Sequence, residues 1–313
     1  MKAIQFLTLT ALGAALFASC SNEEELTRGS YPNDNIIRVT AGVNNMTRGN
    51  EATTALNKDF SLNVVNSTND NYSYANEIFS LKGGTEWSST NKLLWENLAT
   101  PVEIVALYPA TDANTFADVF SKESNTYGTI SYGVKPNQST RDDANDLLLY
   151  HNANFVPKDN LEDGKLDIQF NHAFCRVDIE VTIGSEFNAT NGLAANPIQG
   201  IKVEGTKTTA KIGFASTAPF FTVTPSASGE VTSIIPTLDD FTPAASATEQ
   251  AVAKYSCIVI PQTATLKVVL HTSDMEYEWT GTQKELESGK QYTLQLNLKK
   301  SATTRNFILR ERK

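Results

Sequence analysis

The feature of the sequence that most constrains the fold is an alternation of apolar and polar residues between positions 166 and 183. Apolar residues occupy the even positions of Leu166–Phe170 and then the odd positions of Ala173–Val181. Strict alternation is the pattern of a β-strand with one buried face. Because a one-residue slip moves every side chain to the opposite face, the change of parity near Asn171-His172 predicts a bulge or a bend that crosses between sheets.

Further strand-like segments recur along the rest of the chain, separated by turns rich in Asn, Gly, Pro, Ser and Asp. They lie at residues 36–43, 60–64, 101–109, 146–151, 201–205, 255–260, 265–271, 275–280 and 291–298. Helical periodicity is weak throughout. Short strands between turns indicate a sandwich or barrel rather than alternating strands and helices, so the sequence predicts an all-β fold.

The length of 313 residues favours two domains. We expect two β-sandwiches of about seven strands each, the usual count for such folds. The polar turn at Asp159–Gly164 is the best candidate boundary. The predicted organisation is therefore an N-terminal sandwich at residues 36–164, a C-terminal sandwich at residues 165–300 and a basic tail at residues 301–313.

An apolar run close to the N-terminus predicts export. Lys2 supplies a positive charge, and residues 4–17 then form a nearly unbroken apolar run. A run of about 14 residues is shorter than the roughly 20 that a transmembrane helix needs, but it fits the apolar region of a signal peptide. We therefore expect residues 1–19 to be a signal peptide.

Small residues and a cysteine follow this run, at Ala18-Ser19-Cys20. The segment Leu16–Cys20 looks like a lipobox, the motif in which the cysteine thiol receives a diacylglycerol before cleavage. We predict that Cys20 is lipidated and that the polar residues 20–35 tether the protein to the outer membrane, where two or more acyl chains such as palmitate give stable anchorage. A plain secretory signal with an incidental cysteine is the alternative.

Composition and motifs argue against several functions. The formal net charge is −9, which argues against nucleic acid as a partner, because phosphate binding needs a basic surface. The sequence lacks G-x-S-x-G, P-loop, G-x-G-x-x-G, H-E-x-x-H and C-x-x-C motifs. We therefore predict a non-enzymatic protein without a cofactor or a metal site.

Three groups of residues with functional potential receive a structural interpretation. The three histidines are far apart in the sequence: His151, His172 and His271. A lone histidine in a strand is usually packed or hydrogen-bonded. The tryptophans could stack on sugar rings, although core packing is the commoner role of large aromatic residues: Trp87, Trp95 and Trp279. The segment Arg141–Asp146 offers carboxylates to Ca²⁺, but it lacks the ligand spacing and the Gly of an EF-hand loop, so a solvated acidic turn is favoured.

Two cysteines remain if Cys20 is lipidated, namely Cys175 and Cys257. In an exported protein they could form a disulfide. Both lie in apolar, strand-like segments, so buried free thiols are equally consistent with the pattern. The sequence leaves both alternatives open.

The order of these segments resembles that of the fimbrillin family, the type V pilins of Bacteroidota, and of its Mfa-like branch. The lipobox is followed by an acidic stretch, Asn22–Glu25, that resembles the sorting signals of surface lipoproteins, although a solvated linker explains it as well. The other shared passages are Ile36–Val43 shortly before Thr47-Arg48-Gly49, Trp87 and Trp95 leading into Val102–Pro109, an F-x-H-A-x-x-x-V pattern at Phe170–Val177 and a Gly-Lys-x-Tyr-x-Leu pattern at Gly289–Leu294. Each passage is loose by itself, and their common order over residues 1–300 is more specific.

The resemblance implies transthyretin-like, Greek-key sandwiches that assemble by strand exchange. In this scheme an Arg-specific protease cuts after Arg48 and removes the first strand. Arg28 is an alternative site, although a cut there would release the lipid without opening the sandwich. The displaced strand would carry these apolar residues: Ile36, Ile37, Val39, Ala41 and Val43. A strand from a neighbouring subunit would then fill the exposed groove.

The same resemblance implies a fimbrial or adhesive protein of the cell surface. Its expected partners are other pilin subunits, the outer membrane through the lipid, and ligands on host or bacterial surfaces. The alternative is a lipid-anchored surface glycan-binding lipoprotein, which would need exposed Trp and Tyr side chains.

The C-terminal tail departs from the pattern of many family members, which continue into a further strand. Here the triplet Phe307–Leu309 could pair at a sheet edge, or its basic flanks could leave it disordered. A role as stalk, tip or anchor subunit is therefore left open.

Overall fold

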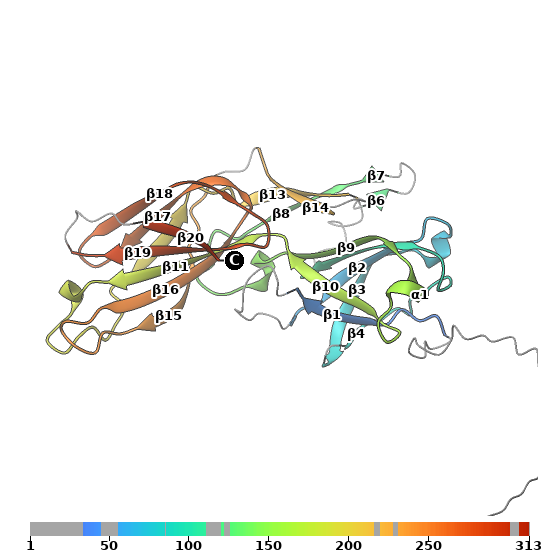
Figure 1. The fold of residues 1–313 in the computed structure, drawn as a ribbon, viewed down its shortest axis with the longest axis horizontal. Coiled ribbons are helices and arrows are strands. Elements are labelled where there is room, and N and C mark those ends of the chain that lie inside the picture. The colour runs from blue at the N-terminus through green and yellow to red at the C-terminus, as the bar shows by residue number, and fades with distance from the viewer. Residues whose placement is uncertain are drawn as a thin grey trace, which may run out of the picture.

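The computed structural model describes residues 34–44, 56–84, 86–110, 120–121, 126–215, 220–227, 231–300 and 307–312. Within them, β-strands dominate (Figure 1). The short helical elements are α1 (Pro157–Asn160) and three 3₁₀ turns, η1 (Asp70–Tyr72), η3 (Asp143–Asn145) and η4 (Ser185–Phe187). None of the helices in the described residues is long and apolar enough to cross a membrane. The prediction of an all-β fold is confirmed.

The N-terminal half forms a seven-stranded sheet that closes on itself, here called the closed sheet. Its strands, in spatial order, are β1 (Val39–Val43), β10 (Leu166–His172), β9 (Leu148–Phe155), β5 (Val102–Tyr108), β2 (Phe60–Val65), β3 (Tyr74–Gly83) and β4 (Glu86–Ser89). Closure depends on β1, which pairs with β10 on one side and with β4 on the other.

The C-terminal half is a sandwich of two sheets. The larger sheet contains β15 (Thr237–Thr242), β16 (Ala251–Val259), β11 (Cys175–Ile183), β19 (Gln291–Leu298) and β20 (Phe307–Arg312). The smaller sheet contains β12 (Gly200–Glu204), β17 (Gln262–His271) and β18 (Glu276–Leu286). Inward-facing residues of both sheets share one apolar core, to which Val177, Leu294 and Val268 contribute. The alternating burial of β11 matches its alternating sequence.

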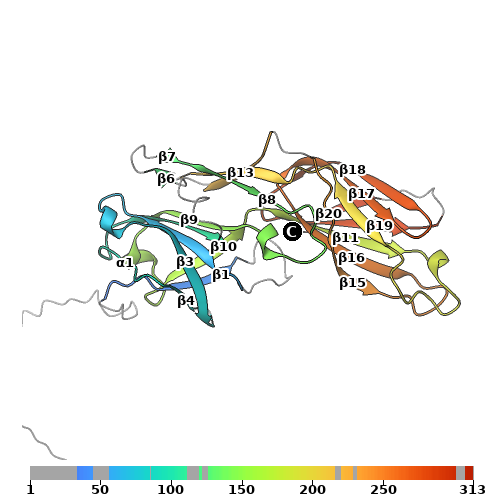
Figure 2. The same cartoon turned by 180° about the vertical axis from the view of Figure 1, so that it is seen from behind.

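A third sheet joins the two halves. It consists of β14 (Phe221–Pro225), β13 (Thr209–Phe214) and β8 (Thr129–Gly133), and a short hairpin, β6 (Phe120–Ser121) with β7 (Thr126–Tyr127), lies nearby (Figures 1 and 2). Val105 and Leu107 of β5 share a core with Ile130 and Ile212 of this sheet, whereas Ile104 belongs to the core inside the closed sheet. Strand β5 is therefore buried on both faces, which explains its continuous apolar sequence.

The boundary between the halves differs from the expected position at residues 164 and 165. Strand β10 was assigned to the C-terminal sandwich, but it belongs to the closed sheet, where it pairs with β1 and β9. Its alternating residues Leu166, Ile168 and Phe170 are buried in the N-terminal core. The chain passes to the C-terminal sandwich at Ala173-Phe174, where the parity of the sequence changes, so the predicted sheet-crossing bend is confirmed.

Two open alternatives are resolved in the C-terminal half. Strand β20 pairs antiparallel with β19, from Gln291 opposite Arg312 to Leu296 opposite Phe307, so residues 307–312 of the tail form a sheet edge. Cys175 and Cys257 are buried thiols and do not form a disulfide. They lie on adjacent strands but not opposite each other, because Cys175 faces Val259. Burial raises the pKa of the Cys257 thiol well above its ordinary range, so this cysteine is unreactive.

Aromatic rings fill the centre of the closed sheet. The Phe60 ring lies 5.4 Å from the Phe79 ring, 4.9 Å from the Trp87 ring and 5.5 Å from the Phe170 ring, measured between centroids. These rings come from β2, β3, β4 and β10, so Phe60 connects strands on opposite sides of the core. Its side chain is completely buried.

Replacement of Phe60 by Ala should lower the free energy of unfolding by about 3–5 kcal/mol, because it leaves a cavity among three rings. Urea denaturation followed by circular dichroism measures the change. Ile78→Ala on β3 is the control, since Ile78 is 38% exposed, and it should cost about 0.5 kcal/mol or less. Equal losses in the two variants would contradict this account of the core.

Candidate functional site: the first strand and its surroundings

Strand β1 is seated in the apolar core of the closed sheet. Ile37, Val39 and Val43 are buried, and Ala41 packs against the same core from a half-buried position. The strand runs parallel to β10 through five successive pairs, from Val39 opposite Leu166 to Val43 opposite Phe170. The segment at 36–43 was expected to be a strand, and its residues 39–43 form one.

The ladder between β1 and β4 is shorter than the ladder between β1 and β10. Their register contains two pairs, Val39 with Trp87 and Thr40 with Glu86. Before the strand, the Ile37 amide donates to the Leu93 carbonyl at 2.9 Å, and the Trp95 amide donates to the Asn35 carbonyl at 2.8 Å. The approach to β1 is thus fixed to the segment that follows β4.

Polar side chains hold β1 to its surroundings on the outer face. The Thr40 hydroxyl donates to Asp167 Oδ1 at 2.9 Å, and the side-chain amide of Asn44 donates to Asn171 Oδ1 at 3.2 Å. Before the strand, Arg38 donates to both carboxylate oxygens of Asp34 at 2.9 and 2.6 Å. This pairing lowers the pKa of Asp34 to about 2, so the pair stays charged at neutral pH.

A groove with a volume of about 440 Å³ lies between the start of β1 and the segment after β4. Phe79 and Trp87 contribute apolar surface to it, whereas residues 88–92 contribute hydroxyl, amide and ammonium groups. The groove therefore lies along the β1–β4 seam, where the ladder contains two pairs.

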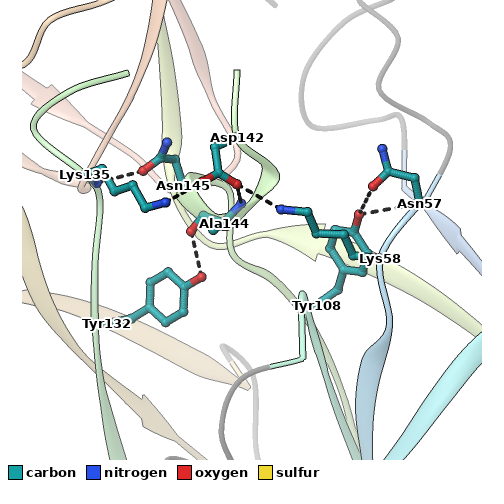
Figure 3. A network of polar contacts seen from close by, with 8 residues as sticks. All are labelled: Asn57, Lys58, Tyr108, Tyr132, Lys135, Asp142, Ala144 and Asn145. Atoms are coloured by element: carbon teal, nitrogen blue, oxygen red, sulfur yellow. Dashed lines mark hydrogen bonds and ion pairs between the residues drawn. The ribbon is translucent and has the colours of Figure 1, made fainter. Parts of the chain in front are cut away.

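A polar joint, shown in Figure 3, holds the chain just before β2. Asp142 accepts a hydrogen bond from Lys58 Nζ at 2.9 Å and one from Lys135 Nζ at 2.5 Å. The backbone amide of Ala144 donates to the same carboxylate at 3.0 Å. These three donors hold the pKa of the Asp142 carboxyl well below its ordinary value, with the Lys135 contact as the largest cause.

Two tyrosines complete the joint (Figure 3). The Tyr108 hydroxyl donates to Asn57 Oδ1 at 3.1 Å and accepts from the Asn57 amide at 3.3 Å. The Tyr132 hydroxyl donates to the Ala144 carbonyl at 2.7 Å, and burial raises the pKa of Tyr132 to about 12. Because Leu56 is also buried in the N-terminal core, residues 56–59 are fixed independently of β1.

The remaining predicted residues fall into two groups. Cys20, Arg28 and Arg48 lie outside the described residues. The three tryptophans are buried, at 3–5% exposure, as the packing interpretation expected: Trp87, Trp95 and Trp279. Each histidine lies beside a carboxylate. His151 and His172 are hydrogen-bonded to Glu103 and Asp146, as that interpretation expected, and His271 Nδ1 lies 3.3 Å from Glu276 Oε2.

The segment Arg141–Asp146 is a structural element. Among the described residues no group of three His, Cys, Asp or Glu side chains could hold a metal ion. Asp142 instead binds two lysines, and Arg141 donates to Asp239 at 2.9 Å. This joint could not be predicted from the sequence, because Lys58 and Asp142 are 84 residues apart.

Asp142→Asn should lower the free energy of unfolding by about 0.5–2 kcal/mol, because it removes the charge that two partly exposed lysines contact. Since the folded pKa is depressed, this contribution is fully present above the unfolded pKa of about 3.9 and is lost as the pH falls through the lower folded value. Urea denaturation of both proteins between pH 7 and pH 2 should therefore show the difference shrinking with acid. Asp240→Asn on β15, whose side chain contacts Thr242, is the control and should change stability by about 0.5 kcal/mol or less. A pH-independent difference would contradict the joint.

Solved structures with similar folds come from Bacteroides. A candidate cell adhesion protein of Bacteroides ovatus ATCC 8483 has a TM-score of 0.56 at 14% identity, over 90% of this chain and 97% of that chain. A second candidate cell adhesion protein, from Bacteroides uniformis ATCC 8492, has a TM-score of 0.58 at 14% identity, over 89% of this chain and 99% of that chain. At this identity the similarity shows the fold.

The sequence comparisons identify the family. No curated protein matches significantly. The profile described as fimbrillin-like matches residues 40–308, which extends from β1 into β20 and covers most of the chain. The chain belongs to the fimbrillin-like family.

Proposed function

We propose that this protein is a fimbrial subunit or fimbria-associated surface protein that assembles by protease-triggered strand exchange. Membership of the fimbrillin-like family makes it a structural or adhesive protein rather than an enzyme. The observation that carries the proposal is the position of β1. This strand fills a central place in a closed sheet, yet it is connected to β2 through the segment that contains Arg48.

The energetics support replacement of β1 rather than its simple loss. Burial of a Val or Ile side chain contributes about 1.5–3 kcal/mol, and β1 with its approach buries Ile37, Val39 and Val43. Each ladder hydrogen bond adds about 0.5–1.5 kcal/mol net. Together these contributions approach the whole stability of about 5–15 kcal/mol that a typical domain has. A subunit without β1 would therefore bind a replacement strand strongly.

The surroundings of β1 favour a cut that removes this strand alone. The chain on the C-terminal side of residues 45–55 is held by Leu56 in the core and by the contacts of Asn57 and Lys58. After a cut at Arg48, β2 would keep its place while β1 lost its covalent connection to it. A neighbouring subunit could then donate a strand to the vacated position.

The N-terminal sequence supports assembly at the cell surface. We propose that the signal peptide directs export and that Cys20 carries the lipid that anchors the precursor in the outer membrane. The family is described as fimbrillin-like, and two proteins of similar fold are described as candidate cell adhesion proteins, which supports a role in adhesion to host or bacterial surfaces.

The alternative of a surface glycan-binding lipoprotein receives less support. It would need exposed aromatic rings on which sugars stack. The three tryptophans are all buried, and Trp87 packs on Phe60 in the core.

Limited trypsin digestion of residues 21–313 should cut after Arg48, release the segment that contains β1 and produce oligomers. Arg48→Ala should block that cut and keep the protein monomeric, whereas the control Arg28→Ala should change neither result. Intact mass spectrometry identifies the cut, and light scattering coupled to size exclusion measures the oligomers. A synthetic peptide of residues 34–48, added in excess, should suppress assembly by refilling the groove. Cut protein that stays monomeric after verified loss of the segment would overturn strand exchange.

Cys20→Ala should abolish lipidation, because the acylated thiol is gone, and should leave an unprocessed or mislocalised precursor. Metabolic labelling with a fatty-acid probe in the cells that produce the protein measures the acylation. Cys175→Ala, which alters a buried thiol, is the control and should label normally. Continued labelling of the Cys20→Ala protein would contradict the lipobox assignment.

A further inference from the structure

The two edges of β1 are paired with neighbouring strands over different lengths. The backbone amide of Leu166 donates to the Arg38 carbonyl, and the backbone amide of Asn44 donates to the Phe170 carbonyl, both at 2.8 Å. Even-numbered residues of this stretch therefore direct their backbone groups toward β10. Because backbone groups alternate in direction along a strand, the odd-numbered residues direct theirs toward β4.

The β4 side is paired at the beginning of β1. Ile37 donates to Leu93, and Val39 is paired with Trp87. The register of β4 ends with Glu86 opposite Thr40, so no residue of β4 lies opposite Ala41 or Val43. Within the described part of the chain, the end of β1 near Arg48 is thus paired with a strand on one side, and its beginning is held on both.

An ion pair lies on the outer face of the closed sheet, over the beginning of β1, which is held on both sides. Lys165 lies just before β10, and its Nζ is 2.6 Å from Oε1 of Glu86 at the start of β4. These strands flank β1 on opposite sides, and the residues next to the ion pair, Leu166 and Trp87, are buried. Because side chains alternate between faces, Lys165 and Glu86 point to the outer face and meet over β1 near Thr40. The Lys165 ammonium holds the pKa of the Glu86 carboxyl below its ordinary value.

We propose that β1 leaves the closed sheet in a fixed direction, beginning at the end next to residues 45–55, and that the Lys165–Glu86 ion pair is a clasp that retains the strand until last. This inference rests on the proposed function, since it describes how the exchanged strand departs. The end near Val43 separates first because, among the described residues, its release breaks one ladder, the one with β10. The beginning separates last because it must also break the contacts with β4 and pass beneath the clasp.

The same geometry gives an order to strand exchange. The positions of Val43 and Ala41 become free while residues 36–39 are still held under the clasp. A strand donated by a second copy of the chain can therefore pair with β10 at the vacated end before β1 has gone. Exchange then proceeds by stepwise displacement, and the apolar core is not exposed all at once.

The release rate tests the clasp. A recognition site for a sequence-specific protease, placed within residues 45–55 of the 21–313 chain, makes the cut independent of Arg48. Trp87 and Trp95 contact the departing segment, so their fluorescence reports its loss after a jump into mild urea. Glu86→Gln and Lys165→Met should each accelerate release by roughly two- to fivefold, the effect of one partly exposed ion pair. The double variant Lys165→Glu/Glu86→Lys should restore the slower rate.

A matched ion pair in the C-terminal sandwich provides the control. Lys267 Nζ and Glu278 Oε2 are 2.9 Å apart, with exposures close to those of the clasp. Glu278→Gln should leave the release rate unchanged. Equal rates for Glu86→Gln and the unaltered chain, or no recovery in the charge-swapped variant, would overturn the clasp.

Hydrogen exchange on the cut but unreleased protein tests the direction. The amides of Gly42 and Asn44, which point toward β10, should exchange before those of Ile37 and Val39. The reverse order, or simultaneous exchange, would overturn directional release. Failure of the proposed function appears separately, as cut and stripped protein that stays monomeric.

Discussion

The parallel pairing of β1 with β10 is the contact on which the N-terminal half depends. Strand β10 follows β9 in the sequence and pairs with it, and β1 connects β10 to β4 so that the seven strands form one continuous wall. The ring of Phe170 on β10, opposite Val43, then packs on Phe60. Removal of β1 would therefore open the wall and uncover aromatic residues together, and this explains why a short strand has so large a place in the proposed assembly.

The polar joint around Asp142 complements this arrangement. It fixes the beginning of β2 through Asn57 and Lys58, so the two strands joined by residues 45–55 differ in their attachments. Strand β1 is held by an apolar face, one long ladder and one short ladder. Strand β2 is held by ladders with both β3 and β5 and by the joint. The connection between them is the place where one cut separates a removable strand from a permanent one.

Much of the fold could be predicted because a strand with one buried face has apolar residues at every second position of its sequence. The alternation in residues 166–183 predicted two strands and the bend between them, and the apolar run at Val102–Tyr108 predicted a strand, which proved to be covered on both faces. The assignment of β10 to the wrong half has a physical reason, since periodicity shows which residues are buried but not which core buries them. The joint and the clasp could not be predicted, because Lys58 with Asp142 and Lys165 with Glu86 are partly exposed pairs, distant in sequence, that follow no pattern.

The sheet of β8, β13 and β14 has a mechanical consequence. Its residues Ile130 and Ile212 share a core with Val105 and Leu107 of β5, so the two halves have a common apolar interior rather than a flexible linker. Apolar interfaces of this kind suppress relative domain motion. A filament of such subunits, pulled from its two ends, would bear the load through stiff units, and its extensibility would reside in the contacts between neighbouring copies.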